Sequence, residues 1–182
     1  MKIGNLLCAV LSLGMFVAAI SAQAAVAKAR TEFTSVYSNL NKDCKTMHGT
    51  NGTDDGDLCR GPSGYQVRVY SAAVALYINA EIRGKEGSFN LATTNFDFDT
   101  RKTQIEWRMA NGKPFAAIIR VPKYDKATDN DPYFGKLIGQ QLAVVGLKGN
   151  ESISFAVDAK DADANAKARE LADKAYSSPT KD

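Results

Sequence analysis

The sequence has few of the residues from which most catalytic and metal centres are built. It holds one histidine, His48, and three cysteines among 182 residues. A single histidine excludes a metal site with several histidine ligands, and no serine stands in a G-x-S-x-G turn. No two cysteines are spaced as C-x-x-C, which argues against a redox pair. We therefore expect no enzymatic activity, no cofactor and no bound metal.

An excess of charge of one sign is also missing. The chain has 23 basic and 20 acidic residues, and the two signs are interspersed, so it carries no strong electrostatic footprint for nucleic acid. After Ala25, no apolar run approaches the roughly 20 residues that a membrane-spanning helix needs. We expect neither a nucleic-acid partner nor a membrane span in the mature chain.

What the sequence does have is the pattern of an export signal at its start. Lys2 gives a positive beginning, a long apolar stretch follows, and Ala22-Gln23-Ala24 supplies the small-x-small motif that signal peptidases cleave. We predict a signal peptide over residues 1–24, with cleavage after Ala27 as the alternative. A retained membrane anchor is the competing interpretation, but no basic stop-transfer cluster follows. The predicted location is the periplasm, or the medium, of a Gram-negative bacterium.

Export decides how the cysteines are interpreted. Cys8 lies inside the predicted signal, which leaves Cys44 and Cys59 in an oxidising compartment and predicts one disulfide between them. Cys8 as a lipidated residue is the alternative, but it lies too close to Met1 to leave an apolar region before it. Removing 24 of the 182 residues leaves 158, the size of one domain. We expect that domain over residues 25–176 and a flexible polar tail over 177–182.

The first segment of the mature domain has two interpretations, a helix or an edge strand. Four apolar residues recur at helical spacing and favour a helix over residues 31–40, namely Phe33, Val36, Tyr37 and Leu40. The Gly- and Asp-rich segment 41–63 predicts a loop held by the disulfide. Alternating apolar residues predict strands over 65–70 and 74–83.

Two hairpins follow, each with a glycine-containing turn. Asn111-Gly112 suits a type I′ turn, because both residues adopt positive φ readily. Counting outward from this turn predicts one buried face that consists of Ile105, Trp107, Ala116 and Ile118. Gly149-Asn150 joins segments 141–148 and 151–158, and the same counting pairs two sets of residues, Val144 with Phe155 and Leu142 with Val157.

A stripe of small residues over 164–175 predicts a C-terminal helix that packs closely on a sheet, with Asp161 or Asp163 capping its first turn. The predicted fold class is α+β. We expect one curved antiparallel sheet of about six or seven strands, a half-barrel or a sandwich, with a helix at each end.

Several side chains invite a chemical interpretation. A hydrolase site would combine His48 with nearby or facing carboxylates, Asp54, Asp55, Asp57 and Glu106. Residues 51–57 resemble half a calcium loop, but Pro62 stands where the bidentate glutamate belongs. For His48 a solvated loop position is favoured over a ligand or base. Trp107, the sole tryptophan, is interpreted as core rather than as a ligand-stacking platform.

Longer motifs cover most of the predicted mature chain: residues 37–44 (YSNLNKDC), 59–67 (CRGPSGYQV), 105–108 (IEWR), 112–120 (GKPFAAIIR) and 157–159 (VDA). This pattern resembles a group of small exported proteobacterial proteins of unassigned function. Many of those carry two further cysteines that are absent here, so the resemblance implies a single bridge. It implies an exported protein with a shared fold, and no activity.

We predict a non-enzymatic, envelope-associated protein that binds another protein or a cell-wall component. The candidate binding surface consists of Ser63, Gly64, Tyr65 and Arg108. One alternative is a lysozyme-inhibitor-like protein, in which the Ser63-Gly64-Tyr65 loop enters the enzyme cleft. The others are a small-molecule or lipid carrier with a cavity between Trp107 and the C-terminal helix, and the hydrolase described above.

Overall fold

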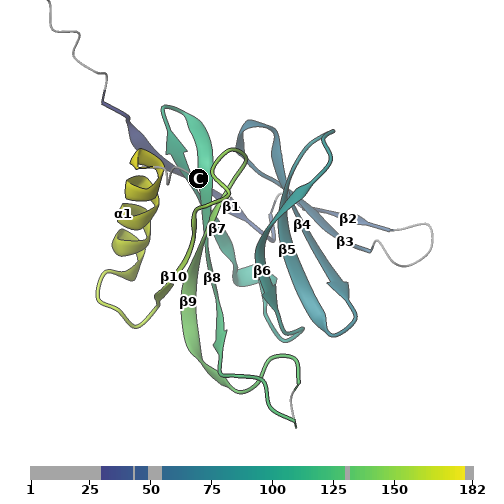
Figure 1. Cartoon of the computed structure of the whole chain (residues 1–182). Coiled ribbons are helices and arrows are strands. Elements are labelled where there is room, and N and C mark those ends of the chain that lie inside the picture. Colours follow the sequence, from purple (N-terminus) through teal and green to yellow (C-terminus); the bar gives the residue numbers. More distant parts are fainter. Residues whose placement is uncertain (1–29, 43, 49–54, 130–131, 179–182) are drawn as a thin grey trace, which may run out of the picture. The chain divides into compact units, whose positions relative to one another are not determined.

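Strands make up most of the structure, a computed structural model that describes residues 30–42, 44–48, 55–129 and 132–178 (Figure 1). The predicted signal peptide lies outside these residues. All strands and the helix belong to one compact unit, Thr31–Asp182. None of the helical segments in the described part of the chain has the length and apolarity to cross a membrane.

Two antiparallel five-stranded sheets account for the described strands. Sheet A has the order β1-β7-β8-β9-β10, with β1 (Phe33–Asn39), β7 (Gln104–Ala110), β8 (Lys113–Tyr124), β9 (Leu137–Gly146) and β10 (Ser154–Asp158). Sheet B has the order β2-β3-β4-β5-β6, with β2 (Cys44–Met47), β3 (Gly56–Arg60), β4 (Tyr65–Ala72), β5 (Ala75–Ile82) and β6 (Ser88–Thr94). Two short 3-10 turns, η1 (Pro62–Gly64) and η2 (Thr100–Lys102), precede β4 and β7.

Sheet A is the middle layer, between sheet B and the helix α1 (Ala164–Ser177) (Figure 1). Because side chains alternate along a strand, each strand of sheet A serves two cores. On β7, Ile105 and Trp107 pack toward sheet B, whereas Glu106 and Arg108 point to α1 and contact residues of that helix. The two faces of sheet A therefore have separate structural roles.

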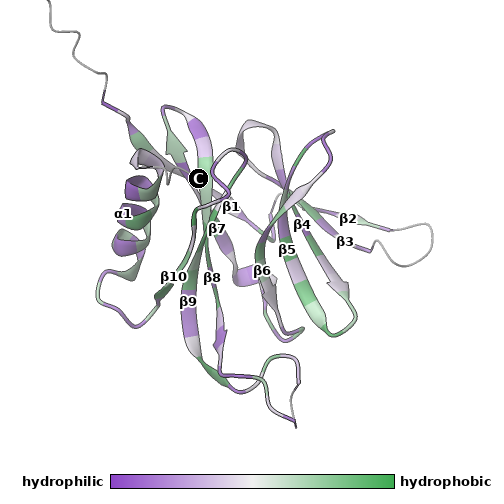
Figure 2. Cartoon of the chain, viewed as in Figure 1, coloured by the Kyte–Doolittle hydropathy of each residue, from purple (hydrophilic) through white to green (hydrophobic). Residues whose placement is uncertain are grey.

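The core between the sheets is the larger of the two. Its fully buried members include Val67, Ile78, Leu91, Ile105, Trp107, Ile119 and Leu147. The second core lies under α1, where three alanines of the helix, Ala164, Ala168 and Ala172, are buried against sheet A. Figure 2 shows hydrophilic and hydrophobic segments alternating along α1, as expected for a helix with one buried side.

The predicted fold class, α+β with one sheet of about six or seven strands and a helix at each end, is wrong. The structure is mostly β, with two sheets in place of one, and no helix forms at residues 31–40. That segment is β1, the edge-strand alternative, and pairs with β7 from Phe33 opposite Ala110 to Asn39 opposite Gln104. Its threonine, valine and aromatic residues favour extended backbone, and the open edge of β7 supplies hydrogen-bond partners along its length. Tertiary pairing thus overrides the helical spacing. The C-terminal helix is present as predicted.

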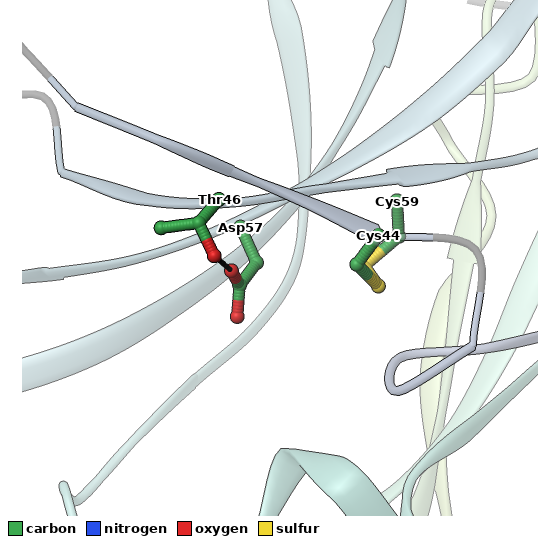
Figure 3. The surroundings of a disulfide bond; sticks show 4 residues. All are labelled: Cys44, Thr46, Asp57 and Cys59. Carbon is green, nitrogen blue, oxygen red and sulfur yellow. Dashed lines mark hydrogen bonds between the residues drawn. A yellow bond between two sulfur atoms is a disulfide. The ribbon is translucent and has the colours of Figure 1, made fainter.

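Part of the predicted loop 41–63 is a hairpin closed by the disulfide. Cys44 and Cys59 are directly opposite each other on β2 and β3 and form the expected bridge (Figure 3). Beside it, Thr46 Oγ1 donates a hydrogen bond to Asp57 Oδ1 at 3.0 Å. Cys59 is buried in the core between the sheets, so the bridge ties the β2 edge to that core.

Removing the bridge is expected to lower the free energy of unfolding by about 3 kcal/mol, because the reduced unfolded chain gains the entropy of an open loop. Urea denaturation of the Cys44→Ala, Cys59→Ala double variant against the wild type measures the difference. Thiol titration of the unfolded wild type should find no free thiol in these two residues. Two free thiols at these positions in the purified protein would contradict the bridge.

The first predicted turn is confirmed, and the second is longer than predicted. Asn111 and Gly112 have φ values of 50° and 76°, the positive values that a type I′ turn requires. In place of a two-residue Gly149-Asn150 turn, hydrogen bonds from Asn150 N to Leu147 O and from Ile153 N to Asn150 O form two successive turns. In the second hairpin, the predicted pairs are confirmed: Val144 is opposite Phe155, and Leu142 is opposite Val157. The strands end earlier than predicted, because β9 stops at Gly146 and β10 begins at Ser154.

The register of the first hairpin differs from the prediction. It shifts between Arg108 and Met109, so Trp107 is opposite Ala117, one residue further along β8 than counting from the turn gives. A bulge of this kind reverses the face of every residue beyond it. Trp107 and Ile118 therefore lie on opposite faces of sheet A. The buried face toward sheet B contains Ile105, Trp107, Ala117 and Ile119, while Ala116 and Ile118 pack under α1.

Candidate ligand-binding cleft

The four residues predicted as a binding surface do not form one. Ser63 and Gly64 are exposed in η1. Tyr65 is only 6% exposed, its ring centroid lies 5.6 Å from that of Trp107, and burial raises the pKa of its hydroxyl. Arg108 is equally buried, but on the opposite face of sheet A from Trp107, against α1. Sheet A lies between Trp107 and α1, so the two belong to different cores.

The residues of the hydrolase hypothesis belong to different sheets. His48 and Asp55 flank the β2–β3 hairpin of sheet B and are exposed, with 3.8 Å between His48 Nδ1 and Asp55 Oδ1. Asp57 accepts the hydrogen bond from Thr46 on the same hairpin, and Asp54 lies outside the described residues. Glu106 is in sheet A and faces α1. Within the described ranges, no group of three or more His, Cys, Asp or Glu side chains is placed to hold a metal ion.

Polar side chains gather instead between sheet A and α1. The Glu106 carboxylate accepts hydrogen bonds from Arg169 Nε at 2.6 Å and Arg169 Nη2 at 3.1 Å. It also accepts one from Ser35 Oγ at 2.5 Å. Arg169 Nη2 donates further to the hydroxyl of Tyr37 at 3.1 Å. The hydrogen bond to Glu106 raises the pKa of Arg169, so the guanidinium remains charged and the pair is a fixed ionic link between β7 and α1.

A second ionic link continues the same network toward the end of the helix. Arg108 holds Asp173 through two hydrogen bonds, Nε to Oδ1 at 3.0 Å and Nη2 to Oδ2 at 2.5 Å. Its Nη1 donates to Ser35 Oγ at 2.7 Å, and that hydroxyl in turn donates to Glu106. Ser35 thus connects the two ion pairs. Both arginine–carboxylate pairs are bidentate, the strongest geometry for such contacts.

A cleft opens beside the Glu106–Arg169 pair, where sheet A extends past the beginning of α1. It encloses about 540 Å³, within the size range of small-molecule sites. Ile118 and Leu142 are its apolar lining from sheet A. The walls come from the segment before β7, from the strands of sheet A and from α1, and consist of Tyr37, Phe98, Asp99, Lys102, Thr103, Gln104, Glu106, Arg120, Gln140, Asn165 and Arg169.

The second carboxylate of the cleft, Asp99, is also engaged. Its Oδ1 accepts hydrogen bonds from the backbone and side chain of Arg101, and its Oδ2 lies 3.4 Å from Lys102 Nζ. The hydrogen bond from the Arg101 side chain is the main cause that lowers the pKa of Asp99. Asp99 is therefore an ionised carboxylate at neutral pH. It cannot serve there as a general acid, which must carry a proton.

Of the residues that line this cleft, sequence reasoning singled out Glu106 as a candidate for chemistry and missed Arg120, Asn165 and Arg169. Arg120 follows the apolar run of β8 and is two residues after Ile118. Because side chains alternate along a strand, the two lie on the same face of sheet A. Asn165 and Arg169 are one helical turn apart on α1, which puts both on one side of the helix. The sequence pattern therefore predicts the face on which each residue lies. It does not predict that α1 packs over sheet A.

Comparison of the chain with protein-family models, with curated proteins and with solved structures gives no match in any of the three.

Proposed function

We propose that this is an exported, non-enzymatic binding protein of the bacterial envelope and that its ligand occupies the cleft between sheet A and α1. Export is supported by the signal-like residues 1–24 and by the disulfide. The observation that carries the proposal is the cleft itself, a concave, polar-walled site with apolar side chains in its lining.

Binding is favoured over catalysis by the state of the acidic groups in the cleft. Glu106 and Asp99 are each held by an arginine, whereas a hydrolytic carboxylate pair needs one member that keeps a proton. The described residues that line the cleft include no histidine, cysteine or serine, the residues most often used as base or nucleophile. This composition supports a binding role for the cleft.

Blocking the cleft tests this function. We expect native mass spectrometry of the exported protein, incubated with a small-molecule extract of the bacterial envelope, to show a bound mass. Gln140→Trp places a large ring in the cleft from an exposed position on β9, and the variant should show no bound mass. Thr93→Trp, at an exposed strand position in sheet B, is the matched control and should retain the bound mass.

The proposal is contradicted if the wild type binds nothing from the extract, or if Gln140→Trp and Thr93→Trp bind equally well. A third outcome is possible, in which Gln140→Trp leaves the bound mass unchanged and substitutions at Ser63 and Gly64 remove it. The binding site would then be the η1 turn, as in the lysozyme-inhibitor hypothesis. Lysis of cell walls by lysozyme in the presence of the protein would then be the next measurement.

A further inference from the structure

One of the cationic side chains that line the cleft has no carboxylate partner among the described residues. Three cationic side chains line it, Lys102, Arg120 and Arg169, against two carboxylates, Asp99 and Glu106. The Asp99 carboxylate is paired with Lys102 and the Glu106 carboxylate with Arg169. Asp99 is bonded in addition to Arg101, which lies outside the lining. Of the three cations in the lining, Arg120 is the one without a carboxylate partner among the described residues.

Arg120 is half-buried and has no carboxylate partner among the described residues. Its one hydrogen bond is a long contact of 3.5 Å from Nη2 to Asn165 Oδ1, a neutral amide. An arginine guanidinium has five N–H donors in a planar fork that matches a carboxylate. Most of these donors are therefore available to a ligand that enters the cleft.

The groups around Arg120 are neutral and hydrogen-bonding. Gln104, Gln140 and Asn165 present amides, each of which has both donor and acceptor atoms. Gln104 uses its Nε2 to reach Asn39 Oδ1 at 3.3 Å, which leaves its carbonyl oxygen as an acceptor. Phe98 and the exposed Tyr37 add aromatic surface. Amides with aromatic and apolar surface suit a small ring that carries several hydroxyl groups.

The beginning of α1 borders the cleft. Asn165 lies in the first turn of the helix, and that turn contains no acidic residue. Asp163, at the N-cap position, accepts no side-chain hydrogen bond from the first turn, contrary to the predicted cap. The first turn of α1 therefore borders the cleft, through Asn165, without a side-chain cap. One arginine without a carboxylate partner matches the charge of a monoanion such as a carboxylate.

We propose that the cleft binds a carboxylate-bearing sugar and that Arg120 receives its carboxylate, while the three amides contact the ring hydroxyls. This inference rests on the proposed function, since it names the ligand class of the same cleft. It adds a specificity residue that sequence reasoning did not single out.

Isothermal titration with three probes, D-glucuronate, D-glucose and inorganic phosphate, tests the inference. We expect the wild type to bind D-glucuronate and to bind glucose and phosphate at least tenfold more weakly. Arg120→Gln should weaken glucuronate binding by about 10- to 100-fold, the usual loss for a hydrogen-bonded charge partner. Arg120→Lys keeps the charge without the fork and should fall between the two. Arg83→Gln, at an exposed position in the turn after β5 of sheet B and outside the cleft, is the matched control and should bind as the wild type does.

Thermal unfolding of each variant confirms that it is folded. Equal binding of glucose and glucuronate, unaffected by Arg120→Gln, would overturn the role of Arg120 and the acid class while leaving the cleft as a sugar site. Tighter binding of phosphate than of glucuronate would overturn the sugar class. Absence of glucuronate binding at millimolar concentration would overturn the inference as a whole. The envelope-extract experiment decides separately whether the cleft binds any ligand.

Discussion

Trp107→Ala should lower the free energy of unfolding by about 3 to 5 kcal/mol, the cost of a large cavity in a packed core. Trp107 is fully buried, its ring lies against Tyr65, and its Nε1 donates to Ser38 Oγ at 3.0 Å. Gly61 approaches so closely that a Cβ there would lie 2.9 Å from the indole ring. The ring therefore joins β1, β7 and the start of β4 in one cluster.

Urea denaturation followed by far-ultraviolet circular dichroism measures this loss without relying on tryptophan fluorescence. Ser38→Ala is the matched control, because it removes only the indole hydrogen bond and should cost about 1 kcal/mol. If Trp107→Ala remained within 1 kcal/mol of the wild type, a value well below the usual range for such a cavity, Trp107 would not be the centre of the core.

The second large effect concerns the ion pair under α1. Asp173→Ala should destabilise the protein by about 3 to 5 kcal/mol, because it leaves the buried Arg108 guanidinium without a counter-charge. The side chains of Arg108 and Asp173 are only 7% and 23% exposed, so water cannot replace the lost contact fully. The free energy of unfolding from urea denaturation gives the comparison.

An exposed ion pair near the same helix provides the control. Asp161 pairs with Lys167 at 2.6 Å, with both side chains well exposed, and Asp161→Ala should change stability by less than about 1 kcal/mol. The double variant Arg108→Met, Asp173→Leu removes both charges and should recover much of the loss. Equal effects of Asp173→Ala and Asp161→Ala would show that the Arg108–Asp173 pair is not buried.

Local sequence patterns predicted correctly those strands and turns in which the pattern of apolar residues agrees with the tertiary packing. The β9–β10 register was predictable because alternation and the buried face of Leu142 and Val144 allow one pairing. The β7–β8 register was not predicted, although Pro114 lies opposite Met109 at the bulge and is the residue type that marks one, since it cannot donate a ladder hydrogen bond. The spacing of apolar residues in segment 33–39 is compatible with a helix or a strand. Pairing with the free edge of β7 makes this segment a strand.

The cleft is harder to predict than the strands because its residues are far apart in the chain. Arg120 and Asn165, which touch, are 45 residues apart. Glu106 and Arg169, which form an ion pair, are 63 residues apart. Each has an ordinary local pattern, a charged residue in a strand or on a helix, and their chemistry arises only when α1 packs on sheet A. The disulfide was predictable because the expected removal of Cys8 with the signal peptide leaves two cysteines and therefore one pairing.

Mapping of ligand-induced chemical shifts tests the central claim, that the cleft between sheet A and α1 is the binding site. In ¹H–¹⁵N spectra of the labelled protein titrated with D-glucuronate, we expect the largest chemical-shift changes at Arg120, Gln140 and Asn165. These residues come from β8, β9 and α1 and meet only in the cleft. Shifts concentrated at Ser63 and Gly64, or scattered over the surface without a maximum at the cleft, would contradict it.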